Sequence, residues 1–132
     1  MNSIKKYVAS GGKIILLVPN IAQNTPSIKA LSEIVGIKII QVDKSKNIKY
    51  ANWIEENFNL NNSFSASSTI AKINPLKNTE ILAVWDEIEK NEPAVTINQN
   101  GSYINWLWSI DGDKYFNMKS LQIVIKKLDP SV

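Results

Sequence analysis

Four carboxylates lie close together in the sequence, at Asp86, Glu87, Glu89 and Glu92. They follow a predicted strand over residues 81–85, at the end where ligands collect in an open α/β sheet if that strand is parallel. Two carboxylates can serve as general acid and general base, as they do in glycosidases. We favour a solvated acidic loop over a catalytic pair, because the sequence predicts neither a deep cleft nor a second domain around these residues.

Two tryptophans near the C-terminus, Trp106 and Trp108, are two positions apart. In an extended strand both indoles would point to one face, about 7 Å apart. This spacing suits a platform on which sugar rings stack, and Trp85 or Trp53 could extend it. The alternative, which we favour, is that the pair packs with Ile104 beneath a helix, since aromatic side chains dominate core energetics. The candidate ligand-binding residues are Trp106, Trp108, Trp85 and Asp86.

Three residue types that most enzymes depend on are missing from the chain. Its 132 residues include no histidine, no cysteine and no arginine. Ser/His/Asp and Cys/His triads, zinc sites built from His and Cys, and arginine fingers are therefore excluded. We predict that the chain is not an enzyme and has no catalytic residue, no metal site and no cofactor.

Two short motifs resemble known sites only superficially. Asp111-Gly112-Asp113 lacks the spacing and the distal glutamate of a calcium loop, so it predicts a turn. Gly11-Gly12 precedes a strand, whereas a phosphate-binding loop presents its glycines at the start of a helix. This pair is interpreted as the end of a helix.

Composition indicates an ordinary globular protein. Hydrophobic residues make up 44% and charged residues 20% of a chain long enough for a single core. The 15 lysines and 12 acidic residues give a net charge of +3, and the lysines are scattered, so we expect no nucleic-acid partner. The longest apolar run, residues 14–19, is too short to span a bilayer, so we expect no membrane insertion by this segment.

The first third of the chain predicts alternating helices and strands. Ser3 caps a helix that Gly11-Gly12 ends, and residues 13–18 form a strand buried on both faces. A second helix ends at Gly36, and residues 37–42 form the next strand. This order with short loops predicts a right-handed parallel crossover.

After residue 42, the sequence patterns that indicate secondary structure are clear only in the second half of the chain. Residues 43–78 give a blurred pattern, in which short helical turns near Trp53 and an exposed loop over residues 59–68 are expected. A strand follows over residues 79–85. Asn100-Gly101 between two β-rich runs predicts an antiparallel hairpin, because both residues tolerate a positive φ. A closing helix covers residues 118–128, with an apolar face that contains the residues Leu121, Ile125 and Leu128.

Two segments resemble a known family. Residues 4–17, Ile-Lys-Lys-Tyr-Val-Ala-Ser-Gly-Gly-Lys-Ile-Ile-Leu-Leu, resemble the helix and YVxxGGxΦΦΦ strand of class I glutamine-amidotransferase-like domains. In particular, they resemble the non-catalytic β-galactosidase trimerisation domain and related accessory domains of surface carbohydrate-active proteins. Residues 80–85 and 93–106 resemble the later strand and hairpin of this family. Catalytic members use a cysteine and a histidine, which this chain lacks.

The resemblance implies a fold and a role. The fold would be a three-layer, flavodoxin-like or amidotransferase-like α/β sandwich, with a mainly parallel sheet and a C-terminal antiparallel hairpin. Residues 1–132 would form a single α/β domain excised from a larger protein, although family members usually carry a strand before the first helix and this chain starts at that helix. The domain would be a non-catalytic accessory or assembly module of a bacterial surface or polysaccharide-related protein. The alternative function is a carbohydrate-binding module that uses Trp106 and Trp108.

The resemblance also implies partners and a location. The expected partners are other domains or subunits of the parent protein, and the alternative partner is a glycan. Zero cysteine fits both an oxidising and a reducing compartment, so composition does not fix the location. The family favours an extracytoplasmic or cell-surface one.

Overall fold

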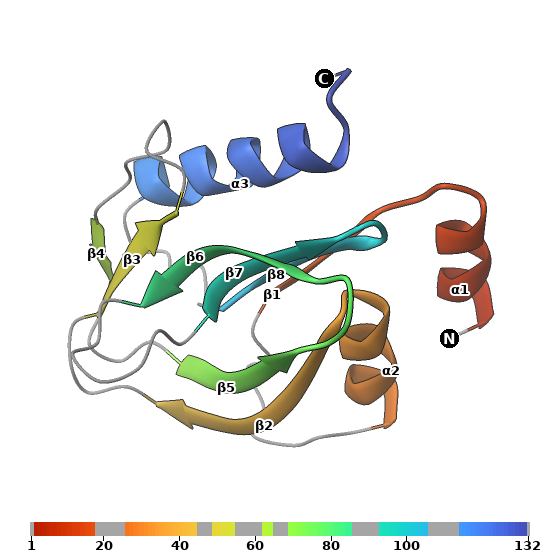
Figure 1. The fold of residues 1–132 in the computed structure, drawn as a ribbon, viewed down its shortest axis with the longest axis horizontal. Coiled ribbons are helices and arrows are strands. Elements are labelled where there is room, and N and C mark those ends of the chain that lie inside the picture. The colour runs from red at the N-terminus through yellow and green to blue at the C-terminus, as the bar shows by residue number, and fades with distance from the viewer. Residues whose placement is uncertain are drawn as a thin grey trace.

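A six-stranded mixed sheet forms the centre of the molecule, and helices and a smaller sheet lie on its two faces (Figure 1). The computed structural model describes residues 2–17, 26–44, 49–54, 62–64, 69–85, 93–105 and 114–131. The elements in chain order are α1 Asn2–Ala9, β1 Ile14–Leu17, α2 Pro26–Ile34, β2 Ile37–Lys44, β3 Lys49–Trp53, β4 Asn62–Phe64, β5 Thr69–Pro75, β6 Glu80–Trp85, β7 Pro93–Asn98, β8 Gly101–Ile104 and α3 Lys114–Leu128.

The central sheet is mainly antiparallel. Its strand order is β1-β8-β7-β6-β3-β4, and among the described strands only the pair β1 and β8 runs parallel. Strands β2 and β5 form a separate antiparallel sheet. The predicted flavodoxin-like or amidotransferase-like sandwich with a mainly parallel sheet is therefore wrong.

The predicted parallel crossover fails at β2, which joins β5 instead of lying beside β1. The physical reason is visible in the burial of this strand. Ile37 and Ile39 are buried, whereas Lys38 and Ile40 are exposed. Such alternation is typical of a strand with one face on the core, whereas parallel strands covered on both faces are continuously apolar. The burial of β2 is therefore that of an outer strand, and its antiparallel direction comes from its pairing with β5.

The middle of the chain supplies most of the unpredicted antiparallel pairing. Strands β3, β4 and β5 lie within the range 43–78, where short helical turns and an exposed loop were expected. Trp53 lies at the end of β3, so the expectation that it faces inward from a short helical turn is wrong, while residues 55–61 lie outside the described part of the chain. The predicted loop over residues 59–68 also contains β4, although the other residues of that range lie outside the described part of the chain. The strands β3 and β4 are short, and the range 59–68 that contains β4 is rich in Asn and Ser, which favours a loop in a reading of the sequence alone.

The predicted β7–β8 hairpin is confirmed, but for a different reason. Its turn residues are Gln99 and Asn100, and the side chain of Asn98 holds the turn: its Oδ1 accepts hydrogen bonds from the backbone N–H groups of Asn100 at 2.9 Å and Gly101 at 3.0 Å. Neither Asn100 nor Gly101 has a positive φ. Gly101 is required because a Cβ there would collide with the carbonyl oxygen of Ile14 in β1. The glycine thus permits the parallel pairing of β1 with β8.

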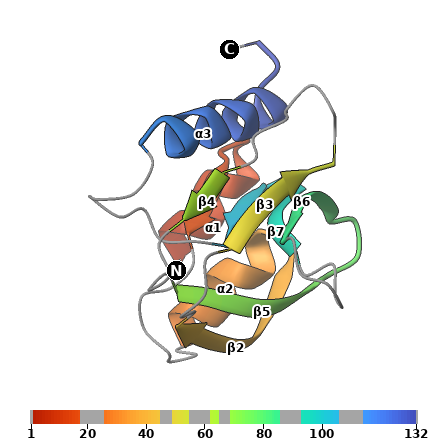
Figure 2. The same ribbon diagram turned by 90° about the vertical axis from the view of Figure 1, so that its left-hand side faces the viewer.

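Two hydrophobic clusters lie on the two faces of the central sheet. The first lies under α3 and contains the fully buried Val124 of that helix together with sheet residues that include Trp85 and Ile104. The second lies between the sheet and the layer of β2, β5 and α2, and it contains Tyr103. Tyr103 and Ile104, which are neighbours in β8, therefore belong to opposite clusters, as the two-residue period of a strand requires. Figure 2 shows α3 and the β2–β5 sheet on opposite sides of the central strands.

The predicted helices are present, and their ends follow local rules. The N–H of Gly12 donates to the carbonyl of Tyr7 at 2.9 Å and that of Gly11 to Val8 at 3.0 Å, while Gly11 has φ 98°. This pattern is a Schellman motif, so the interpretation of Gly11-Gly12 as a helix end is confirmed. No helix within the described residues is long and apolar enough to cross a membrane.

Candidate functional site

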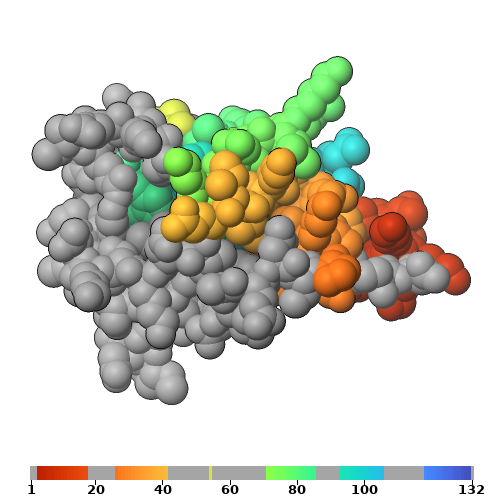
Figure 3. Space-filling model, turned by 90° about the horizontal axis from the view of Figure 1, so that it is seen from below, coloured from red at the N-terminus to blue at the C-terminus, as the bar shows by residue number. Residues whose placement is uncertain are grey.

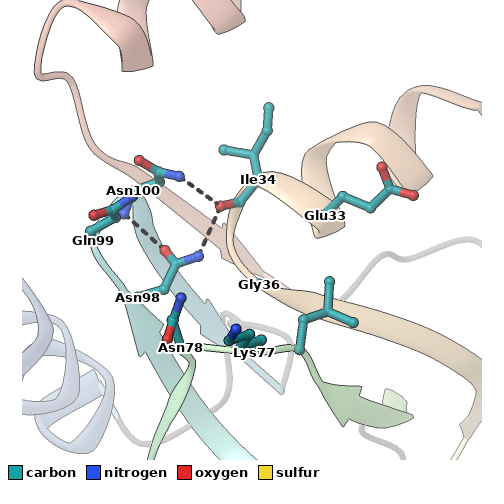
Figure 4. Close-up of a pocket in the computed structure, with 9 residues that line it drawn as sticks. Glu33, Ile34, Gly36, Lys77, Asn78, Asn98, Gln99 and Asn100 are labelled. Carbon is teal, nitrogen blue, oxygen red and sulfur yellow. Dashed lines mark hydrogen bonds between the residues drawn. The ribbon is translucent and has the colours of Figure 1, made fainter.

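Three turns meet at the C-terminal end of α2 and form a polar pocket (Figure 4). The turn between β5 and β6 is joined to the end of α2 through the carbonyl of Gly36, which accepts hydrogen bonds from Leu76 N and Thr79 Oγ1, both at 2.8 Å. The β7–β8 turn is joined to α2 through Asn98 Nδ2, which donates to the carbonyl of Ile34 at 3.0 Å. These bonds satisfy carbonyl groups that a helix end leaves without partners.

The pocket has a volume of about 370 Å³. This value is at the lower end of the range for small-molecule sites, roughly 300–1,000 Å³. Side-chain amides dominate its polar lining, together with one carboxylate and one ammonium group. The lining residues are Glu33, Ile34, Gly36, Leu76, Lys77, Asn78, Asn98, Gln99 and Asn100. We call this site the amide pocket.

Some amides of the pocket are fixed and others are available to a ligand. Asn98 is held by its bonds to α2 and to the hairpin turn, and Asn100 Nδ2 donates a longer bond to the Ile34 carbonyl at 3.4 Å. The side chains of Glu33, Asn78 and Gln99 are exposed, and they form no hydrogen bond or ion pair with another described residue. The pocket therefore combines a rigid wall with free donors and acceptors.

A second hollow adjoins the amide pocket. It has a volume of about 320 Å³, and Glu33 and Leu76 line both hollows. Beyond these two shared residues it is bounded by Lys29 and Ser32 of α2 and by residues 37–39 of β2. Figure 3 shows the surface of α2, β2 and β5 from this side of the molecule. Together the hollows follow the C-terminal half of α2.

A buried asparagine joins the two sheets in the interior. Asn105 is fully buried directly after β8. Its Oδ1 accepts from the backbone N–H of Ala71 in β5 at 2.8 Å, and its Nδ2 donates to the Ala71 carbonyl at 2.8 Å and to the Pro93 carbonyl at 3.0 Å. The carboxamide thus pairs with β5 as a neighbouring strand would. Sequence analysis missed this role because the partners are distant in the chain.

Tyr103 completes this buried network. Its hydroxyl donates to Asn105 Oδ1 at 3.2 Å, and its side chain is fully buried. Burial raises the pKa of this hydroxyl well above its ordinary value, because the interior disfavours the charged phenolate. The group therefore stays neutral at physiological pH and acts as a hydrogen-bond donor within the interior.

The structure describes one of the four predicted ligand-binding residues. Trp85 is 1% exposed and belongs to the cluster under α3, so its indole offers no surface to a sugar. Trp106, Trp108 and Asp86 lie outside the described residues, and their roles stay predictions. The argument that ligands collect beyond residue 85 assumed a parallel strand, whereas β6 is antiparallel to both neighbours.

Sequence analysis also missed the amide pocket. Asn78 and Asn98 belong to segments 20 residues apart, and Glu33 comes from a third segment. A visible signal was the frequency of asparagine in the turns, which by itself indicates only turn chemistry. Within the described part of the chain, no group of three acidic residues could hold a metal ion.

Comparison with known proteins gives a fold and no family. The sequence matches no known family model and no curated protein. Three similar solved structures are a cold-adapted β-galactosidase from Rahnella sp. R3 (TM-score 0.71, 20% identity), a β-galactosidase from Bacillus circulans sp. alkalophilus (0.70, 14%) and α-L-fucosidase isoenzyme 2 from Paenibacillus thiaminolyticus (0.69, 10%). Each similarity covers 96% of this chain.

This chain spans only about a fifth of each glycosidase: 20% of both β-galactosidases and 22% of the fucosidase. It therefore has the fold of a small region found within larger glycosidase chains. This finding supports the part of the sequence resemblance that named β-galactosidase domains. The class I glutamine-amidotransferase label is not supported by these structures.

Proposed function

We propose that this chain is a non-catalytic accessory domain that works by contact within a larger carbohydrate-active protein. The observation that carries the proposal is the fold match, which covers nearly all of this chain and about a fifth of two β-galactosidases and a fucosidase. The finer proposal is that the parent is a bacterial surface or polysaccharide-related protein.

The residue content supports a non-catalytic role. The whole sequence lacks histidine, cysteine and arginine, so the commonest proton-transfer groups, nucleophiles and phosphate clamps are unavailable. In the described residues, the buried polar groups Asn105 and Tyr103 bond to one another and to backbone atoms. These bonds stabilise the junction between the sheets.

The first test is genetic. We expect the DNA on either side of the coding segment to encode a carbohydrate-active domain in the same reading frame. Deleting this segment from the parent should leave kcat on a small chromogenic glycoside unchanged while altering oligomeric state or thermal stability. A parent unrelated to carbohydrates, or a deletion that removes only kcat, would contradict the proposal.

The second test concerns catalysis by the chain itself. The purified domain should release no nitrophenol from a panel of nitrophenyl glycosides above the buffer rate. Turnover that Asp86→Ala or Glu87→Ala abolishes would show that the acidic segment is catalytic. That result would overturn the non-catalytic assignment.

A further inference from the structure

We propose that the amide pocket is a binding site for a neutral saccharide. The choice of ligand class rests on the proposed function. The location rests on the structure alone, because the pocket forms where the end of α2 and the turns of two hairpins are tied together by hydrogen bonds. This site is separate from the predicted tryptophan platform, whose residues Trp106 and Trp108 lie outside the described part of the chain.

The charge and chemistry of the lining favour an uncharged ligand rich in hydroxyl groups. Glu33 and Lys77 contribute one charge of each sign, and the other polar side chains are the neutral amides of Asn78, Asn98, Gln99 and Asn100. A carboxamide carries a donor and an acceptor, as does each sugar hydroxyl. An anion or a cation would meet no excess of opposite charge in this pocket. A saccharide, by contrast, can pair with amide oxygens and amide N–H groups at once.

The apolar part of the lining suits the C–H face of a sugar ring. Ile34 and Leu76 are the aliphatic residues of the pocket, and Leu76 is 39% exposed. Leu76 and Glu33 also line the adjoining hollow. A ligand longer than one ring can therefore continue past these two side chains, so an oligosaccharide should bind more tightly than its monosaccharide.

The pocket is held in shape before any ligand arrives. Hydrogen bonds fix Asn98 between α2 and the hairpin turn, so this wall loses little freedom on binding. Opposite it, Asn78 has φ 66°, the one positive φ at a non-glycine residue in the described chain. Figure 4 shows Asn78 below Asn98, with Glu33 on the far side of the Ile34 carbonyl. Exposed side chains thus lie on both sides of the fixed Asn98 wall.

The test is a nuclear magnetic resonance titration of the isotopically labelled chain with galactose, lactose and β-1,4-galactotetraose. We expect saturable shifts in the signals of the amide-pocket residues, with affinity in the range of about 1 mM for an open site and tighter for the tetrasaccharide. Sodium sulfate and spermidine serve as charged probes and should cause no saturable shift. No saturable shift with any sugar, or equal binding of sulfate, would overturn the proposal.

Substitutions test whether the sugar binds in the amide pocket. The pair Asn78→Gly and Glu33→Gln should weaken tetrasaccharide binding at least tenfold, and glycine keeps the backbone conformation of position 78 available. The control Asn74→Ala removes an exposed amide from β5 outside the pocket and should bind as the parent does. Binding that survives the pair but is lost in Trp108→Ala would place the sugar on the tryptophan platform and overturn the proposal.

The two proposals fail separately. A carbohydrate-active parent whose domain shows no sugar-dependent shifts removes the amide-pocket site and leaves the accessory role standing. Saturable shifts in a domain whose parent is unrelated to carbohydrates remove the accessory role and leave the site standing.

Discussion

Removing the side chain of Asn105 should weaken the junction between the two sheets and lower the free energy of unfolding. In Asn105→Ala, three buried backbone groups lose their side-chain partner: the N–H and carbonyl of Ala71 and the carbonyl of Pro93. A buried polar group left without a partner costs about 1–3 kcal/mol. Because water can enter part of the vacated volume, we expect a loss of about 3–6 kcal/mol, a large share of the roughly 5–15 kcal/mol of a typical domain.

Urea unfolding followed by far-ultraviolet circular dichroism measures this loss. The control is Asn74→Ala, which removes an exposed amide from the same strand as Ala71 and should change stability by less than about 0.5 kcal/mol. If Asn105→Ala and Asn74→Ala have equal unfolding midpoints, the inference that this carboxamide joins the sheets is wrong.

A second substitution keeps the test decisive if Asn105→Ala does not fold. Asn105→Asp preserves the shape and Oδ1 but replaces the donating Nδ2 with an acceptor, which then faces the carbonyls of Ala71 and Pro93. Burial raises the pKa of such a carboxyl, so this variant should gain stability as the pH falls through the folded pKa. A variant as stable as the parent at neutral pH would refute the role of the Nδ2 donor.

Three further predictions use the same unfolding assay. Above about pH 10 the free energy of unfolding of the unsubstituted protein should fall by up to about 1.4 kcal/mol per pH unit from Tyr103 alone, because the raised pKa in the folded state lets the unfolded state lose the proton first. Tyr103→Phe should reduce this dependence on pH, and an unchanged dependence would contradict the burial argument. Gly101→Ala should destabilise by about 1–3 kcal/mol and speed amide exchange in β1, because its Cβ would collide with the backbone of Ile14. Gly11→Ala also destabilises, because position 11 has φ 98°, but its Cβ meets open space, so amide exchange in β1 should change less; equal exchange in β1 would be evidence against the close approach. Asn98→Ala should lower the free energy of unfolding by about 1–3 kcal/mol, because three hydrogen bonds are lost. Gln99→Ala in the same turn should leave stability unchanged, and equal stability of the two variants would show that Asn98 does not fix α2.

Elements with strong local signals were predictable. The β7–β8 hairpin, the strand that ends at Trp85 and the helix stop at Gly11 were all expected, because turn chemistry and apolar runs act between neighbours in the chain. The closing helix was also expected, but its buried face is centred on Val124 rather than on Leu121 and Ile125. Periodicity identifies an apolar face, while contact with the sheet selects its centre.

The pairing of the strands was not predictable in the same way. Strands β3, β4 and β5 lie in a part of the chain where the sequence gives a weak pattern, and β3 and β5 pair with strands distant in the chain. The antiparallel direction of β2 is set by its partner β5, which lies about 30 residues later in the chain. The helix between β1 and β2 therefore did not reveal this direction. A parallel crossover and an antiparallel partner are both compatible with the same local order of elements.

By itself, the sequence determined the absence of imidazole, thiol and guanidinium groups, the positions of several elements and the ends of the first two helices, because these depend on composition or on adjacent residues. Only the tertiary structure decided the antiparallel character of the sheet, the burial of Trp85 and the partners of Asn98 and Asn105. The two asparagines bond to backbone atoms 64 and 34 residues away, and such contacts exist only once the strands have packed.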